Sequence, residues 1–339
     1  MKAIVVTADK TLELAEVPTP QLRAGEVLVK VHATGVNRAD LLQAAGYYPP
    51  PPGESEIMGL ECAGEIVDAG DTDRQVGEKV ACLLAGGGYA EYVAVPAGQL
   101  LPIPEGYSYE QAAAVVEVAA TVWSNLGMLT GLAAGQTVLI HGGAGGIGTF
   151  AIQLAKHLGA QVAVTAGSVE KLEACRRLGA DILINYREEN FADVLKNRCD
   201  RILDIIGAKY LDQNVTALAP DGHMVIIGMQ GGVKCMASAL VISAAAIILG
   251  IFKYESLLGG GPIHTASSAK RTCKLSASAV EYTATDLIPI SRHVRMTRKA
   301  ISPRLAINIF LNIVVWFRMD PLNTKVGQTL QEKSYQPIF

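Results

Sequence analysis

Short β-rich runs of mainly apolar residues, separated by turn residues, recur through the first hundred positions of the chain. They lie at residues 3–7, 26–33, 61–69, 79–84 and 91–95, with Pro and Gly residues between them. The four prolines at 49–52 cannot be helical and predict a rigid loop. We therefore expect a small β-barrel in this region.

The pattern changes near residue 108. Residues 109–128 suit helical segments, and a regular alternation of strands and helices follows. We expect strands at 136–141, 161–165, 182–184, 201–206 and 223–227, and helices at 148–158 and 169–178. This alternation with short connections predicts a doubly wound parallel sheet, so the fold class is α/β. The predicted domains are 1–118, a β-rich catalytic domain; 119–234, a dinucleotide-binding domain; and 235–339, a divergent tail.

Composition narrows the class of protein. Half of the 339 residues are hydrophobic and 18% are charged, which is typical of a globular chain of two domains. The net charge of −3 gives no reason to expect a nucleic-acid partner. The N-terminus lacks the apolar run of a secretory signal, and the six cysteines form no CxxC pair. We therefore expect a cytoplasmic protein without a disulfide framework.

A glycine-rich segment lies between a predicted strand and a predicted helix. The order is His141-Gly-Gly-Ala-Gly-Gly-Ile-Gly148. Such a loop lets the backbone approach a pyrophosphate closely, and the helix N-terminus offers free N–H groups to the phosphates. A glycine-rich turn without a ligand would show the same residues, but the strand–helix context favours a dinucleotide site. The candidate cofactor-binding residues here are Ala144, Gly145, Gly146, Ile147 and Gly148.

The end of the second strand distinguishes between the two nicotinamide cofactors. An NAD site usually has an acid there for the ribose 2′-hydroxyl. This chain instead reads Thr165-Ala-Gly-Ser168, with Lys171 following. A hydroxyl and an ammonium suit the charged 2′-phosphate of NADPH. Lys171 alone could be an ordinary solvated lysine; the missing acid favours NADPH.

Several motifs agree in order and spacing with one known family. These motifs are Gly35-Val-Asn-Arg-Ala-Asp40, Gly46-Tyr-Tyr-Pro-Pro-Pro-Pro-Gly53, Met58-Gly-Leu-Glu-Cys-Ala-Gly64, Gly86-Gly-Gly-Tyr-Ala-Glu-Tyr92 and Gly228-Met-Gln-Gly-Gly232. Over residues 1–232 the chain resembles the zinc-free, zeta-crystallin-like quinone oxidoreductases of the medium-chain dehydrogenase/reductase superfamily, of the p53-inducible type. The resemblance implies a GroES-like catalytic domain, a Rossmann domain, an active site in the cleft between them, and hydride transfer from NADPH to quinones.

The resemblance also implies roles for individual residues. Asn37 and Thr121 would lie near the nicotinamide, and Tyr48 would line the substrate site. A purely structural role is open for some of them: Asn37 could be a turn residue and Thr121 could bond its own helix. Tyr186 could simply cap a strand. The implied cofactor-binding residues beyond the glycine loop are Ser168, Lys171, Tyr186, Gly228, Met229 and Gln230. No residue stands out as an obligatory general acid, so water can supply the proton.

Zinc is not expected. Zinc-dependent relatives place a cysteine where Asn37 stands and a histidine where Leu60 stands, and neither residue here is a good zinc ligand. The cysteine cluster of their structural zinc site is also missing between Cys82 and Tyr92. His32 and His141 suit ordinary strand-edge positions better than metal ligation.

The tail does not fit the resemblance. Residues 1–234 carry 17 Lys and Arg against 27 Asp and Glu, whereas residues 235–339 carry 12 against 5. Residues 235–252 are uncharged and rich in Ala and Ile, and residues 305–317 form a second apolar run. Three hypotheses compete: an end that is not the family's own, arising from a shifted frame, altered splicing or a faulty gene model; a membrane anchor; or a diverged form of the usual end. The first would leave the parallel sheet without its last strands.

The main functional hypothesis is therefore an NADPH:quinone reductase. An enone or alkenal reductase shares the scaffold and the chemistry. The chain could also have a non-enzymatic zeta-crystallin-like role or be an inactive family member, and the tail makes inactivity a serious hypothesis. Expected partners are a quinone or enone substrate and, if the C-terminal part folds, further copies of the chain; a membrane is not expected.

Overall fold

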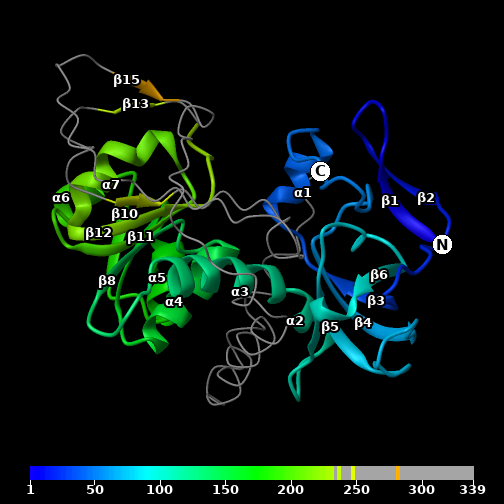
Figure 1. The fold of residues 1–339 in the computed structure, drawn as a ribbon. Helices are drawn as coiled ribbons and strands as arrows, with labels where there is room; N and C mark the ends of the chain where they lie inside the picture. The colour runs from blue at the N-terminus through cyan, green and yellow to red at the C-terminus, as the bar shows by residue number, and fades with distance from the viewer. Residues whose placement is uncertain (233–234, 238–245, 249–279, 283–339) are drawn as a thin grey trace, which may run out of the picture. The chain divides into compact units, whose positions relative to one another are not determined.

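The computed structural model describes residues 1–232, 235–237, 246–248 and 280–282 (Figure 1). The described residues fall into two compact units, one formed by Met1–Ala119 and the other beginning at Ala120. This boundary lies beside the end of the predicted catalytic domain at residue 118. Each unit is described by itself below.

The first unit is built on an antiparallel sheet of five strands. The order is β6 (Tyr92–Pro96), β3 (Glu26–Thr34), β4 (Glu61–Asp68), β5 (Lys79–Leu83) and β7 (Leu100–Pro102). A separate hairpin pairs β1 (Lys2–Val6) with β2 (Leu12–Glu16). Alternate residues such as Val27 and Val29 are fully buried, because successive side chains of a strand point to opposite faces. The predicted β-rich character of this region is confirmed.

Short helices flank this sheet. They are α1 (Arg38–Ala44), η1 (Ala97–Gln99), α2 (Tyr109–Ala113) and α3 (Val116–Val122), and the last is followed by a π-helical segment, η2 (Trp123–Leu129). The stretch Tyr109–Leu129 is long and apolar enough to cross a membrane by length and composition. However, Ala113 and Val116 from it pack into the core against Ala63 and Ala81 of the sheet, which is the behaviour of a core helix.

The second unit contains a parallel sheet of six strands. Its order is β10 (Ile182–Asn185), β9 (Gln161–Ala166), β8 (Thr137–His141), β11 (Cys199–Asp204), β12 (Leu218–Ile226) and β14 (Ala246–Ile248). Numbered along the sheet's own chain order, this is 3-2-1-4-5-6, the order of the Rossmann dinucleotide-binding fold. The strand order reverses between β8 and β11, so a ligand is expected at the carboxyl ends of these two strands.

Helices cover both faces of the parallel sheet. In Figure 1, α4 (Gly146–His157) and α5 (Val169–Arg177) lie on one side, and α6 (Phe191–Val194) and α7 (Leu211–Ala217) lie on the other. The short η3 (Ala208–Tyr210) leads into α7. Because both faces are covered, the strands read as continuous apolar runs, and Val138, Leu139 and Ile140 are all fully buried. The predicted α/β fold is confirmed.

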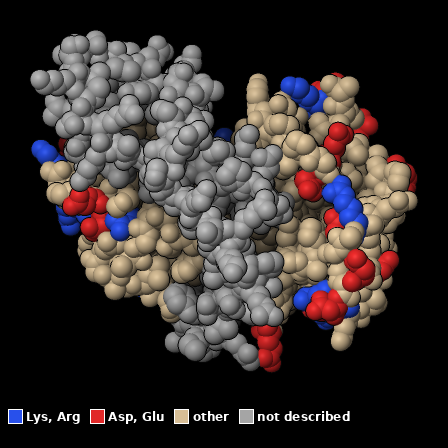
Figure 2. Space-filling view, in the orientation of Figure 1, with Lys and Arg blue, Asp and Glu red and all other residues tan. Residues whose placement is uncertain are grey.

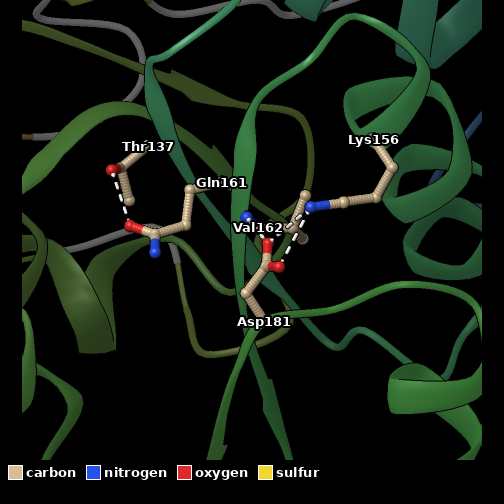
Figure 3. Close-up of polar contacts among 5 residues, drawn as sticks. All are labelled: Thr137, Lys156, Gln161, Val162 and Asp181. Carbon is tan, nitrogen blue, oxygen red and sulfur yellow. Dashed lines mark hydrogen bonds and ion pairs between the residues drawn. The ribbon is translucent and has the colours of Figure 1, made fainter.

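An ion pair fixes the amino edge of this sheet, opposite the end that carries the glycine loop. Asp181 accepts hydrogen bonds from Lys156 Nζ at 2.9 and 3.0 Å and from the Val162 amide at 2.7 Å (Figure 3). Beside it, Thr137 and Gln161, the first residues of β8 and β9, contact each other through their side chains at 3.3 Å. These contacts hold α4 against β9 at the edge of the sheet opposite the glycine loop.

The structure corrects one expectation about the tail. Strand β14 pairs in parallel with β12, with His223 opposite Ala246 and Val225 opposite Ile248. The sheet therefore does not end at residue 234 without its last strand. An uncharged Ala/Ile-rich run suits a buried parallel strand as well as a membrane helix. The origin of the tail and its relation to a membrane stay predictions.

The rest of the tail has little described structure. Strand β13 (Cys235–Ala237) pairs antiparallel with β15 (Val280–Tyr282). The second apolar run, 305–317, and most of the predicted tail range 235–339 lie outside the described residues.

Candidate active site

The glycine loop joins β8 to α4 at the carboxyl edge of the sheet. Gly145 is the N-cap of α4, and no side chain caps the helix there. Gly145 and Gly146 are exposed, Ala144 and Ile147 are half-buried, and Gly148 is buried. The first N–H groups of a helix have no intrahelical acceptor, so this loop presents donors to solvent. An anionic group such as a pyrophosphate fits this position.

The glycines of the loop are required for different reasons. Gly142 has a φ of +68°, which side chains rarely adopt. A Cβ at Gly143 would lie 2.8 Å from Val164 Cβ, and one at Gly148 would lie 2.6 Å from Gly143 Cα. At Gly145 the nearest atom to such a Cβ would be Gly142 O at 3.4 Å, an ordinary contact. Protein packing therefore demands glycine at 142, 143 and 148 but not at 145, where a ligand would supply the reason.

A chain of buried polar groups runs beneath the loop and links three strands. The Gly142 amide donates to Thr165 Oγ at 3.3 Å, and that oxygen lies 3.0 Å from His141 Nδ1. His141 Nε2 lies 2.7 Å from Asn214 Oδ1, and Asn214 Nδ2 donates to Asp204 Oδ2 at 3.0 Å. Because Asn214 Oδ1 can only accept, His141 carries its proton on Nε2 and accepts from Thr165 at Nδ1.

The pKa values of the two titratable groups in this network agree with the direction of its hydrogen bonds. Burial lowers the pKa of His141 to about 4, so the imidazole is neutral near pH 7. Burial raises the pKa of Asp204 to about 6, although the amides of Ile206 and Gly207 and the side chain of Asn214 favour its ionised form. The network therefore holds both the glycine loop and the turn after β11 in place. His141 is a satisfied strand residue, as the sequence indicated.

The predicted 2′-phosphate residues gather at the end of β9. Ser168 is the N-cap of α5, and its Oγ accepts from the Lys171 amide at 3.4 Å. A Cβ at Gly167 would lie 2.5 Å from Tyr186 Oη, so the tyrosine ring reaches over the strand end beside Ser168. We call Ser168, Lys171 and Tyr186 the corner at the end of β9; Ser168 is half-buried, the other two are exposed, and the segment from Thr165 to Ser168 contains no acidic residue.

The loops after β11 and β12 continue the pairing of their strands. The Gln230 amide donates to Ile205 O at 3.2 Å, and a Cβ at Gly228 would lie 2.8 Å from the same oxygen. Gly228, Met229 and Gln230 are therefore brought to the carboxyl edge of the sheet, next to the turn that Asp204 holds. The role that the resemblance implies for them stays a prediction.

In the first unit, Asn37 lies beside a buried carboxyl group. Asn37 is the half-buried N-cap of α1, and its Nδ2 donates to Glu61 Oε1 at 2.8 Å. The other oxygen, Glu61 Oε2, accepts from the Glu117 amide at 2.9 Å. Glu61 is 2% exposed, and burial raises its pKa to about 7 despite these two donors; the charges of Glu117 and Asp40 raise it further.

A second buried acid lies next to this pair. Asp40 Oδ2 accepts from the backbone N–H of Asn37 at 2.7 Å and from Tyr89 Oη at 2.8 Å. Burial raises the pKa of Asp40, and burial together with Asp40 raises that of Tyr89. The pKa of Tyr48 is also raised, first by burial and then by the charges of Glu117 and Asp40. Tyr48 therefore lies within electrostatic reach of what we call the carboxyl cluster, formed by Asn37, Asp40, Glu61 and Tyr89.

Thr121 lies on α3, the helix whose first turn contains Glu117. It is half-buried, and its carbonyl accepts from Asn125 Nδ2 at 2.8 Å. The π-helical segment begins two residues later, at Trp123, and such segments are frequent at functional sites. Thr121 belongs to the second unit and Asn37 to the first, so each is described only within its own unit.

The donor set in the first unit does not fit zinc. The two positions where zinc-dependent relatives carry metal ligands hold the side-chain amide of Asn37 and the apolar side chain of Leu60. Leu60 is 2% exposed. Within residues 1–232, no three His, Cys, Asp or Glu side chains come together as a metal site would need.

Sequence reasoning missed several residues of this site. Asp40, Glu61 and Tyr89 occur in the quoted motifs but were given no role, and Asp204 and Asn214 were not singled out. Glu61 and Asp204 share one feature that the sequence does show, which is a carboxylate at or near the end of a predicted strand. Glu61 begins β4 and Asp204 ends β11. The partners of Glu61, which are Asn37 and the Glu117 amide, lie 24 and 56 residues away in the sequence and leave no such signal.

Charged side chains show no large segregation on the face drawn in Figure 2. On it, Lys and Arg residues are interspersed with Asp and Glu across the described residues. The expectation of no nucleic-acid partner stays a prediction.

Fold and site together define a class: a dinucleotide-dependent oxidoreductase with a GroES-like unit and a Rossmann unit. The model described as the alcohol dehydrogenase GroES-like domain matches residues 23–105, and the model described as zinc-binding dehydrogenase matches residues 146–261. The chain belongs to the medium-chain dehydrogenase/reductase superfamily. The second match continues past residue 232, where the sequence analysis placed the end of the resemblance, and this favours a diverged family end up to residue 261.

Sequence relatives include multidomain synthases and a single enzyme. Polyketide synthase GfsB of Streptomyces halstedii is 38% identical over 214 residues, which is 62% of this chain but 4% of that protein. The chain spans only a small part of such synthases. Prostaglandin reductase-3 of Bos taurus is 32% identical over 250 residues, covering 72% of this chain and 66% of that protein.

Solved structures extend the comparison. The quinone oxidoreductase of Pseudomonas syringae pv. Tomato DC3000 is 31% identical with a TM-score of 0.62, covering 68% of this chain and 74% of that one. CurK enoyl reductase is 26% identical with a TM-score of 0.68, covering 76% and 82%. A mycobacterial protein complexed with NADPH is 31% identical with a TM-score of 0.62, covering 68% and 75%.

Proposed function

We propose that this chain is a zinc-independent NADPH:quinone oxidoreductase. The observation that carries the proposal is the donor set around Asn37. A metal ion that acts as a Lewis acid would need a ligand at position 37. The residue there is Asn37, whose side-chain amide donates to the buried carboxyl group of Glu61. Without a Lewis acid on the substrate oxygen, hydride transfer is easiest to acceptors that spread the incoming charge over a conjugated system. Quinones meet this requirement.

The cofactor choice rests on the corner at the end of β9. The N–H groups at the start of α4 would hold the pyrophosphate, and Ser168, Lys171 and Tyr186 would hold the 2′-phosphate. The mycobacterial relative complexed with NADPH supports this choice. When bound, the nicotinamide supplies a hydride. The residues of the chain bind and orient the reactants, and water supplies the proton.

A second candidate is an NADPH-dependent enone reductase. The similarity to CurK enoyl reductase and to polyketide synthases favours it. An enone spreads charge in the same way as a quinone, so the carboxyl cluster is compatible with both substrates.

Steady-state assays on the full-length protein separate the candidates. NADPH and NADH oxidation would be followed at saturating 1,4-benzoquinone and at saturating 3-nonen-2-one. We expect kcat/KM to be higher with NADPH than with NADH. We also expect it to be higher with the quinone than with the enone. A preference for the enone would replace the quinone proposal with the second candidate. A folded protein that binds NADPH but oxidises it with neither acceptor would be the inactive family member.

A further inference from the structure

Glu61 holds two separate elements of the chain through its two oxygen atoms. Oε1 accepts from the Asn37 side chain, and Oε2 accepts from the Glu117 amide in the first turn of α3. Asn37 begins α1, and α3 carries Thr121 one turn after Glu117. One carboxyl group therefore joins the start of α1 to the first turn of α3 within the first unit.

The fold makes room for this carboxyl group. Gly35 is buried, and a Cβ there would overlap the carboxyl atoms of Glu61. The Gly35 amide approaches Glu61 O at 3.4 Å, and Thr34 Oγ donates to the same oxygen at 2.7 Å. The segment before Asn37 is thus held by the backbone carbonyl of Glu61, and Asn37 itself is held by the Glu61 side chain. A buried charge costs free energy, so an arrangement that keeps one needs a reason.

We propose that Glu61 is a positioning residue, which fixes the Asn37 amide and the first turn of α3 in one arrangement for hydride transfer. This inference rests on the proposed function, because it assigns Glu61 a part in that reaction. Because Nδ2 donates to Glu61 Oε1, the side-chain amide of Asn37 keeps a single orientation. Small displacements of a positioning group can cost large factors in rate.

The ionised carboxylate is the form that accepts from both donors at full strength. The groups that face it are Asn37 and the charged or titratable side chains of Asp40, Glu117 and Tyr89. The two neighbouring acids disfavour ionisation, and no Lys, Arg or His is among the groups that shift the pKa of Glu61. Protonation of Glu61 should therefore loosen the arrangement near neutral pH.

The test uses the full chain and four variants. In E61Q, an amide nitrogen would face one of the two donors, so one hydrogen bond is lost. In G35A, the carboxyl group is displaced while its chemistry is unchanged. In N37D/E61Q, donor and acceptor exchange places, which restores the bond between positions 37 and 61. E65Q is the control, because Glu65 lies on the same strand, where it is opposite Lys30 and Lys79.

We expect kcat to fall on the order of tenfold or more in E61Q and in G35A, with NADPH affinity little changed. N37D/E61Q should recover part of the loss. Wild-type kcat should fall as pH drops through about 7, and this limb should disappear in E61Q while E65Q keeps it. An active wild type whose kcat and pH limb survive in E61Q and G35A would overturn the inference. An inactive wild type that binds NADPH would instead count against the proposed function.

Discussion

His141 Nε2 lies 2.7 Å from Asn214 Oδ1, at the centre of the polar chain that joins the glycine loop to the turn after β11. Both residues are fully buried, so each of their polar atoms depends on its partner. This pair explains how two loops that are far apart in sequence are held at one edge of the sheet. It also makes the network sensitive to the loss of any one member.

The first prediction concerns this network. Asn214→Leu would leave the His141 Nε2–H donor buried without a partner, and Asp204 Oδ2 would keep only the Gly207 amide as a donor. We expect a loss of about 3 kcal/mol in the free energy of unfolding, measured by urea denaturation. Asn190→Ala is the control, because Asn190 Oδ1 only caps α6 by accepting from the Ala192 amide. Its loss should be about 1 kcal/mol. Equal losses in the two variants would contradict the network.

The second prediction separates the glycines of the loop. Gly148→Ala should destabilise the second unit and weaken NADPH binding, because its Cβ would meet Gly143. Gly145→Ala should leave the unfolding midpoint within about 1 °C of wild type and still weaken NADPH binding, because only a ligand would meet the new methyl group. Fluorescence titration and thermal unfolding measure the two effects. Unchanged NADPH affinity in Gly145→Ala would remove the loop from the site.

The third prediction concerns cofactor choice. Lys171→Ala should weaken NADPH binding on the order of tenfold while barely changing NADH binding, because only NADPH carries the 2′-phosphate. Lys156→Ala is the matched control: Lys156 pairs with Asp181 at the opposite edge of the sheet. It should leave the ratio of the two affinities unchanged. Equal losses for both cofactors in Lys171→Ala would exclude Lys171 from the 2′-phosphate corner.

The fourth prediction concerns stability and pH. The pKa of Glu61 is about 7 in the folded chain, against 4.5 for an ordinary glutamate. The folded state therefore keeps a proton that the unfolded state has released. This group contributes stability below about pH 4.5, and the contribution is lost as pH rises through about 7. We expect the unfolding free energy of E61Q relative to wild type to rise over that window by up to about 3 kcal/mol.

The comparison between the two proteins isolates Glu61. Asp40 and Asp204 also have raised pKa values, but they are present in both proteins and cancel in the difference. The measurement is urea denaturation at a series of pH values between about 4.5 and about 7.5, which brackets the shift. A difference that stays constant across this range would show that Glu61 is ionised in both states.

The strands of the second unit were predictable because their hydrophobic pattern is strong. The glycine loop, α4 and α5 were found within a few residues of their observed ends. Strand β2 and helix α1 were missed because they are short, and Leu12 and Leu14 of β2 are exposed, so neither element shows a clear period. The π-helical segment after Val122 has no sequence signal that we know of.

The site was predictable only in part, for a physical reason. Loop residues such as Gly145 and Ser168 act near their own position in sequence, so local pattern finds them. Asn37 and Glu61 are 24 residues apart and His141 and Asn214 are 73 apart, and such pairs depend on tertiary packing. The predicted cytoplasmic location and self-association stay predictions.

The close approach of Gly35 to Glu61 has a consequence for how this chain can change over generations. A side chain at position 35 leaves the site of the Glu61 carboxyl group undisturbed only after position 61 has become shorter, whereas a shorter residue at 61 is compatible with glycine at 35 at once. Substitutions at the two sites must therefore occur in one order. In a set of descendants, residue sizes at positions 35 and 61 should vary inversely.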